Sequence, residues 1–268
     1  MQFGEIFSNS LKYPISDYTK LLIVGVVCVL TSLSAIFVQF GIYNRTLGLI
    51  FGIIALVANI LLLGYGLSVM KHGIEMDDVI PDFDWATNFV DGLKYILVSI
   101  VYLLVPTLVT TVVAFALGSG PLSKILTQDT LAAAASGNST QLNLVLNSIP
   151  QEAWSGLFTA IAVSSIVAII LFVIFGLFLE IGICRLAKYG SIGEAFSFGQ
   201  IWSDLKEIGI LKVLGFIIVV SVICSLIGLV IGFVSIIPFV GVIVATLVLR
   251  PFMLLFSNRA MGLLYSEI

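Results

Sequence analysis

The sequence predicts an all-α polytopic membrane protein with six transmembrane helices arranged as three helix pairs. Of the 268 residues, 60% are hydrophobic and only 10% are charged, whereas soluble globular chains carry about 25% charged residues. A soluble fold of this size could not bury so much apolar surface, so the excess must face lipid. The apolar runs show no period-two alternation, which leaves helices rather than barrel strands as the spanning structure.

Six apolar runs are long enough to cross about 30 Å of hydrocarbon at 1.5 Å per residue. In chain order they are 21–40, 46–70, 95–117, 154–184, 210–235 and 239–263.

Lys and Arg are distributed unevenly between the two sides of the membrane that these runs would cross. The side of the N-terminus has nine of them: Lys12, Lys20, Lys71, Lys94, Arg185, Lys188, Lys206, Lys212 and Arg259. The opposite side has two, Arg45 and Lys124. Cytoplasmic loops carry the excess of Lys and Arg, so we expect a multi-pass protein of the cell membrane with both termini in the cytoplasm.

Three segments on the expected inner side share a pattern, with a bulky apolar residue four positions before a Leu-Lys pair. They are 7–12, 89–94 and 201–206. Apolar residues at this spacing form one stripe on a helix, which suits a short amphipathic helix in the membrane interface. We therefore predict a single transmembrane domain over 1–268, built from three pseudo-repeats that each contain one interfacial helix and two spans. Their approximate limits are 1–75, 80–190 and 193–268.

The second pseudo-repeat is longer because it contains an outer loop at 118–150, rich in Ser, Thr, Asn, Gln and Ala. The loop is either an outer lid or a set of short interfacial helices. Asn138-Ser139-Thr140 matches the N-glycosylation pattern on the expected outer side, which makes Asn138 a candidate glycosylation site.

Glu180 and Arg250 are the two charges most plainly inside the predicted spans. Ionisable residues in the membrane are costly and usually face a partner or a cavity. If Arg185 and Arg259 mark the inner ends of their helices, Glu180 lies about 7 Å and Arg250 about 13 Å inside the membrane. The two residues either form a structural ion pair or line a path for a solute or proton. A third alternative places Glu180 at the interface beside Arg185.

Two further residues in the predicted spans, Asn59 and Pro251, are of interest beside these charges. Asn59, near the middle of the second span, makes either an interhelical hydrogen bond or a ligand contact. Pro251 directly follows Arg250 and should kink the last helix, which frees a backbone carbonyl close to that charge.

The sequence predicts no enzyme, no cofactor and no metal site. The single histidine, His72, excludes His-rich metal sites, and no phosphate-binding Gly-Lys-Ser/Thr loop occurs. The acids between Glu75 and Asp91 do not follow the spacing of a calcium-binding EF-hand. We expect Asp82 or Asp84 to cap the helix that ends at Lys94. A net charge of −3 without a basic cluster argues against nucleic acid as a partner.

Two stretches of the chain resemble a known family. Pro81-Asp82-Phe83-Asp84-Trp85, followed by Phe89-Val90-Asp91-Gly92-Leu93-Lys94, is similar to the signature of DUF4013, a family of archaeal and bacterial membrane proteins of unknown function. Gly64-Tyr65-Gly66 resembles the end of that family's second helix. The resemblance implies membrane location and architecture over nearly the whole chain, but no catalytic residues. It implies no role for Arg250 or for the loop 118–150.

The sequence favours a non-enzymatic membrane module that organises envelope or lipid-associated partners. The expected partners are the lipid bilayer and either another membrane protein or a second copy of the chain. The alternative is a small-solute transporter with a polar site around Glu180, Arg250 and Asn59. A continuous polar cavity that connects these three residues to one surface would favour the transporter.

Overall fold

The computed structural model describes residues 2–42 and 44–268, which are almost wholly helical. Its elements are α1 (Phe3–Lys12), η1 (Tyr13–Ile15), α2 (Tyr18–Leu30), α3 (Leu33–Gln39), α4 (Arg45–Ile74), α5 (Trp85–Ile125), α6 (Gln128–Ala135), α7 (Ser139–Ser148), α8 (Gln151–Tyr189), α9 (Ile192–Ala195), α10 (Phe198–Ile208), α11 (Ile210–Ser235), α12 (Val240–Val244), η2 (Ala245–Leu249) and α13 (Arg250–Tyr265). The η1 segment is a 3₁₀ turn and η2 is a π-helical turn.

Five helical segments are each long and apolar enough to cross a membrane, namely α4, α5, α8, α11 and the continuous run Val240–Tyr265. A sixth candidate is the pair Phe3–Ile15 and Tyr18–Leu30, whose axes meet at 79°. Several apolar helices of this length indicate a multi-pass membrane protein. The last five predicted spans coincide with the five long segments, the sixth beginning one residue earlier, whereas the first, 21–40, is divided between α2 and α3.

The helices group into two compact units. Unit 1 comprises residues 1–99 and 177–268, and unit 2 comprises residues 100–176. The long helices α5 and α8 each begin in one unit and end in the other.

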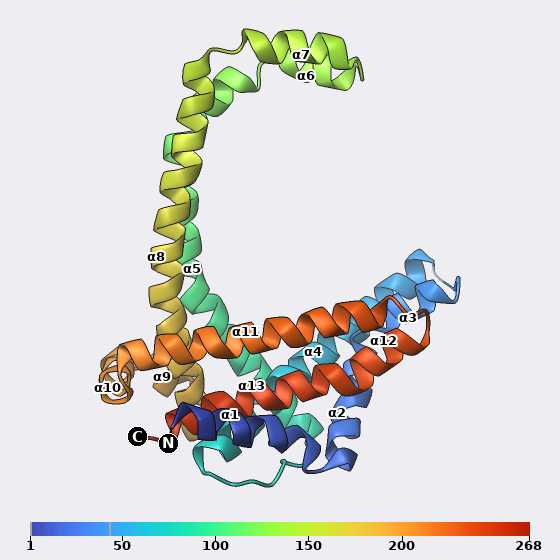
Figure 1. Ribbon diagram of the computed structural model, residues 1–268, viewed down its shortest axis with the longest axis vertical. Helices are drawn as coiled ribbons and strands as arrows, with labels where there is room; N and C mark the ends of the chain where they lie inside the picture. The colour runs from blue at the N-terminus through green and yellow to red at the C-terminus, as the bar shows by residue number, and fades with distance from the viewer. Residues whose placement is uncertain (1, 43) are drawn as a thin grey trace. The chain divides into compact units, whose positions relative to one another are not determined.

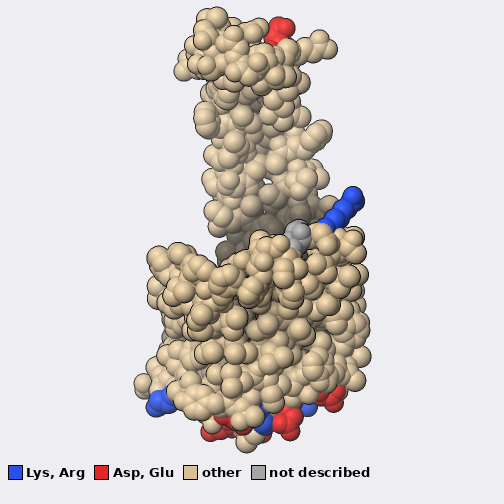
Figure 2. All heavy atoms as spheres, turned by 90° about the vertical axis from the view of Figure 1, so that its right-hand side faces the viewer, with Lys and Arg blue, Asp and Glu red and all other residues tan. Residues whose placement is uncertain are grey.

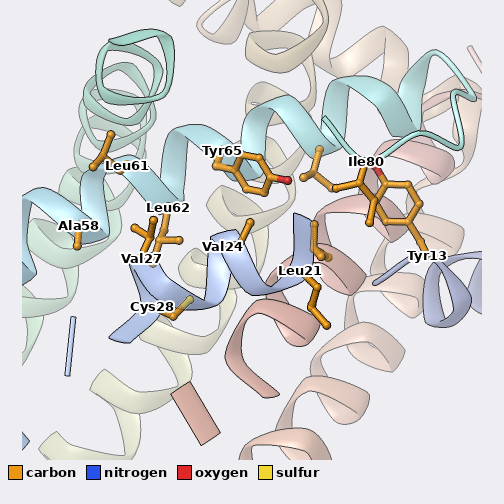
Figure 3. Close-up of a cluster of buried hydrophobic side chains, with 12 residues drawn as sticks. Tyr13, Leu21, Val24, Val27, Cys28, Ala58, Leu61, Leu62, Tyr65 and Ile80 are labelled. Atoms are coloured by element: carbon orange, nitrogen blue, oxygen red, sulfur yellow. The ribbon is translucent and has the colours of Figure 1, made fainter. Parts of the chain in front are cut away.

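Unit 1 is built around α4 and α13, which pack along one another, with α2 and α1 alongside (Figure 1). Apolar side chains of α2 and α4 interdigitate in a buried cluster (Figure 3). Its labelled members on these two helices are Leu21, Val24, Val27, Cys28, Ala58, Leu61, Leu62 and Tyr65. On the face of unit 1 seen in Figure 2, charged residues gather mainly along one edge and leave a broad uncharged band. Such a band suits contact with lipid.

The two stretches that resemble the family lie against each other in unit 1. A Cβ at Gly64 would lie 1.8 Å from the carbonyl oxygen of Asn88, and one at Gly92 would lie 1.9 Å from that of Ile60. Glycine at both positions therefore lets the backbones of α4 and α5 touch. The Tyr65 hydroxyl donates to the Pro81 carbonyl at 3.0 Å and holds the intervening loop on α4.

The expected helix cap before α5 is Asp84. Its Oδ1 accepts hydrogen bonds from the backbone N–H groups of Ala86 and Thr87 at 2.9 and 3.1 Å. Hydrogen bonds of this kind stabilise the ionised carboxylate, so they lower the pKa of Asp84, and the bond from the Thr87 backbone has the largest effect.

The structure corrects the prediction of three equivalent interfacial helices. Two of them are separate helices, α1 and α10, but residues 85–94 are the uninterrupted start of α5. Pro14 follows the end of α1, and Gly209, at φ +100°, ends α10, whereas neither Pro nor Gly separates Lys94 from the span after it. The Leu residues of the pattern also differ, because Leu205 is buried while Leu11 and Leu93 are exposed.

Unit 2 contains the later part of α5, the packed pair α6 and α7, and the first part of α8. The predicted loop 118–150 is thus largely helical, with the short helices α6 and α7 in its middle. Between α5 and α8 lies a groove of about 630 Å³, whose lining includes Ala114, Phe115, Gly118, Ala160 and Ser164.

Candidate functional site

The first predicted span is interrupted in the middle of unit 1. Helix α2 ends at Leu30 and α3 begins at Leu33, with Thr31 and Ser32 between them. The Thr31 hydroxyl turns back and donates to the Cys28 carbonyl at 2.7 Å, which satisfies one of the orphaned acceptors at the helix end. The break therefore presents two hydroxyl side chains within a span.

A second irregularity faces this break. Residues Ala245–Leu249 form the π turn η2, directly before Arg250 and Pro251. Pro251 has no N–H to give to the carbonyl of Leu247, four residues earlier, so a regular α-helical ladder cannot continue there. The Leu247 carbonyl points instead at Gly25 of α2, where a Cβ would lie only 2.0 Å from its oxygen. Glycine at position 25 therefore lets the backbones of α2 and η2 touch.

The Arg250 side chain reaches from this turn to the break in the first span. Its Nη1 donates to the Ser32 hydroxyl at 2.9 Å and to the Thr31 hydroxyl at 3.3 Å. Within the part of the chain that the structure describes, the Nε and Nη2 donors make no hydrogen bond. A guanidinium carries five N–H donors in a planar fork, so most of its capacity is unused.

Arg250 lines a cavity of about 420 Å³, which we name the Arg250 cavity. Its polar lining also includes Thr31, Asn59, Tyr95 and Asn258. Asn59 donates its Nδ2 to the carbonyl of Ala55 at 2.7 Å, which leaves its Oδ1 as an acceptor. Asn59 and Arg250 are both exposed although they lie in spans.

Glu180 lines a second cavity of about 190 Å³, the Glu180 cavity. The other polar side chains on its wall are Tyr95, Ser221, Ser257 and Asn258. Ser257 and Asn258 both donate to the carbonyl of Leu254, at 3.3 and 2.9 Å, which leaves oxygen lone pairs available. Among the described residues, none forms a hydrogen bond or ion pair with the Glu180 carboxylate.

The two cavities adjoin, because Tyr95 and Asn258 line both. Gly66 also lines the Arg250 cavity, and a Cβ there would lie 3.0 Å from Nδ2 of Asn258, so glycine makes room for that amide. All lining residues belong to unit 1. The walls therefore join all three residues singled out from the sequence: Asn59, Glu180 and Arg250.

Glu180 and Arg250 do not pair in the structure. Arg250 is engaged by Thr31 and Ser32, and Glu180 lies in the adjoining cavity without an ionic partner among the described residues. The structural ion pair was one of the alternatives left open by the sequence, and the described residues do not form it.

Two other arginines, Arg185 and Arg259, anchor unit 1, although the sequence indicated them only as the ends of their helices. Arg259 is 1% exposed and binds the Asp78 carboxylate and the carbonyl of His72, the latter at 3.1 Å. Arg185 is also buried and donates to Asp204 at 2.8 Å and to the Glu194 carboxylate. Their partners lie in other helices and loops, so hydropathy alone could not reveal these anchors.

Asn138 lies outside both cavities, at the N-terminus of α7. Its Oδ1 accepts hydrogen bonds from the backbone N–H groups of Thr140 and Gln141 at 3.0 and 3.2 Å. Asn138 is therefore the helix cap and is exposed; its glycosylation stays a prediction. In residues 2–42 and 44–268, no group of three or more His, Cys, Asp or Glu is placed to hold a metal ion.

Comparison with known proteins shows the family of the chain but names no activity. Neither the curated proteins nor the solved structures contain a match to this chain. A family model described as "Protein of unknown function (DUF4013)" matches residues 47–240, which include Asn59, Glu180 and both stretches quoted above, but not Arg250. Because this match covers well over half of the sequence, the chain belongs to the DUF4013 family.

Proposed function

We propose that the protein binds a small polar solute within the membrane and carries it across. The observation that supports this proposal is the pair of adjoining cavities whose walls contain Asn59, Glu180 and Arg250. Charged side chains in the bilayer usually face a partner or an aqueous cavity. Glu180 has no partner among the described residues, and Arg250 uses only one of its nitrogens.

The backbone around the cavities also favours this function. Transporters often place their solute sites near the middle of the membrane, where helices are interrupted and backbone groups are freed. Here the break at Thr31 and Ser32 faces the π turn before Arg250. Single π turns occur frequently at functional sites. The proposed activity moves the solute without changing it chemically, so we propose that the protein is not an enzyme.

Uptake by purified protein in liposomes tests the proposal, with radiolabelled amino acids, monocarboxylates and sugars as probes. We expect saturable uptake of at least one class, reduced at least tenfold by Arg250→Met or by Asn59→Ala. Arg45→Met and Asn138→Ala, which alter exposed residues outside both cavities, should leave uptake unchanged. Uptake that is equal in protein-free liposomes, or unaffected by every cavity variant, would contradict the proposal.

The proposed transport path requires a defined topology. We propose six spans, with both termini and the loop before α5 inside and the segment 118–150 outside. A reporter fused at Ser136 should be accessible only from outside, and one at Met76 only from the cytoplasm. Opposite labelling of either site would refute this topology.

A membrane module that organises envelope or lipid-associated partners is the second candidate. The exposed apolar side chains of unit 2, such as Phe115 and Phe158 at 73% and 67% exposure, favour it because they offer a large surface for other membrane components. This candidate predicts no saturable flux for any probe. It also predicts that cross-linking through unit 2 captures a discrete membrane partner or a second copy of the chain.

A further inference from the structure

The two cavities contain one positive and one negative charge at different levels of the bundle. Along α13, Arg250 precedes Ser257 by seven residues and Met261 by eleven, and both of these line the Glu180 cavity. At a rise of 1.5 Å per residue, these two residues of the Glu180 cavity lie about 10–16 Å along α13 from Arg250. A small α-amino acid could not contact both charges, because a single carbon atom separates its ammonium and carboxylate groups.

Arg250 is suited to an anion with a planar, two-oxygen face. Its guanidinium is fixed through Nη1 by Ser32 and Thr31, and Nε and Nη2 lie on the same edge of the planar group. Such an edge forms two parallel hydrogen bonds with a carboxylate. Within the described chain no acid binds Arg250, so an incoming carboxylate has no resident competitor.

Glu180 is suited to a small cation. Its carboxylate shares the cavity with the oxygens of Tyr95, Ser221, Ser257 and Asn258, which are the hard ligands that small cations prefer. The titratable groups near Glu180 are Tyr95 on α5 and Cys184 on its own helix. The residues that α4, α11 and α13 contribute to the cavity are all uncharged.

The charge count links the two cavities. The empty site is neutral as a whole, with one guanidinium and one carboxylate. Binding of an anion alone would leave a net negative charge in the membrane, which is costly, whereas an anion and a cation together restore neutrality. The empty and the doubly loaded site are thus the two states that can cross the membrane cheaply.

We propose that the site carries a carboxylate-bearing solute together with a monovalent cation, with the carboxylate at Arg250 and the cation, a proton or Na⁺, at Glu180. This inference rests on the proposed transport function and adds its substrate class and its coupling. The coupling is electrostatic: over about 10–16 Å, at an effective dielectric constant of about 20, removal of the Glu180 charge strengthens anion binding about tenfold.

The experiment measures binding of acetate, butyrate and benzoate to the full-length protein in nanodiscs by calorimetry. Titrations are made at pH 5.5 and 7.5, in choline and in Na⁺ buffers with the same anion. We expect affinity to rise about tenfold either at the lower pH or with Na⁺, and these two arms identify the cation. Glu180→Gln should bind the carboxylate tightly in every buffer, because Arg250 and the bound carboxylate alone then form a neutral site. Glu152→Gln, an exposed acid outside both cavities, should behave like the wild-type protein.

Arg250→Met should abolish carboxylate binding. If that variant fails to fold, Arg250→Lys tests the same point, because it keeps the charge but loses the two-pronged edge and should bind at least tenfold more weakly. Equal affinity in all buffers, or a cation dependence that persists in Glu180→Gln, would overturn the coupling. Binding or uptake of sugars but of no carboxylate would overturn the anion class and leave the proposed transport intact. Only the loss of saturable uptake for every probe would also remove the proposed function.

Discussion

The two arginines of α13 lie in regions of opposite character. Arg259 is buried, lies 4.6 Å from the centre of the Tyr13 ring, and has every nitrogen of its guanidinium hydrogen-bonded. Arg250, nine residues earlier, is exposed to a cavity and donates only through Nη1 to two hydroxyls. The same residue type in one helix therefore holds the bundle together at one point and keeps most of its hydrogen-bond donors unused at another. The count of satisfied donors distinguishes these roles, whereas the position in a span does not.

A second contrast concerns cavities. The groove of unit 2 is larger than either cavity of unit 1, about 630 Å³ against 420 and 190 Å³, yet none of its lining residues is charged. Lipid chains can fill such a groove without loss of hydrogen bonds. Among the described residues, the smaller cavities present the Glu180 carboxylate without a partner, unused guanidinium donors of Arg250 and the amide oxygens of Asn59 and Asn258, which lipid cannot satisfy. The chemistry of the wall, rather than volume, identifies the candidate site.

The largest expected effect on stability comes from Arg259→Met. Removing a buried guanidinium strands the acceptors that it binds, so we expect the free energy of unfolding to fall by about 3 kcal/mol. Thermal unfolding in detergent measures the change. Arg250→Met, the matched variant in the same helix, should cost less than about 1 kcal/mol because only two hydroxyls lose a partner. Equal losses in both variants would remove the distinction between the two regions.

Gly64→Ala tests the close contact between α4 and α5. The added Cβ would meet the Asn88 carbonyl oxygen at 1.8 Å, so the helices must separate, and we expect a loss of about 1–3 kcal/mol, measured by thermal unfolding in detergent. Gly52→Ala in the same helix is the control, because no atom beyond its own stretch of helix lies within 4 Å of the position that its added methyl group would take. That change should be neutral or stabilising by up to about 1 kcal/mol. A stable Gly64→Ala protein would mean that the two helices are not in backbone contact.

The smallest effect concerns pH and the cap of α5. The lowered pKa of Asp84 means that its charged form stabilises the folded state. This contribution is complete above the ordinary carboxyl pKa of about 4 and is lost as the pH falls through the lower folded value. Asp84→Asn keeps a capping side chain without titrating, so its melting temperature should decline less between pH 5 and pH 3 than that of the wild-type protein. An identical decline would argue against the charged cap.

Much of the fold could be predicted because lipid imposes a local rule on sequence. The long helices follow from unbroken apolar runs, and the cap at Asp84 follows from a side chain that binds its own next residues. The Leu-Lys pattern predicted three equivalent interfacial helices, and this prediction was wrong for residues 85–94. Whether such a segment becomes a separate helix depended on Pro14 and Gly209 at two junctions and on their absence after Lys94.

The sequence by itself determined that this is a membrane protein of apolar helices, and it marked Asn59, Glu180 and Arg250 as polar groups that lipid does not tolerate. It also placed a proline beside Arg250. Tertiary structure alone decided what these groups face. The partners of Arg250 are more than two hundred positions away, at a break in another helix, and Gly25 and Gly66 determine how closely the walls approach. Hydropathy is a property of one segment, whereas a cavity is made by contacts among several, so only the packed helices reveal it.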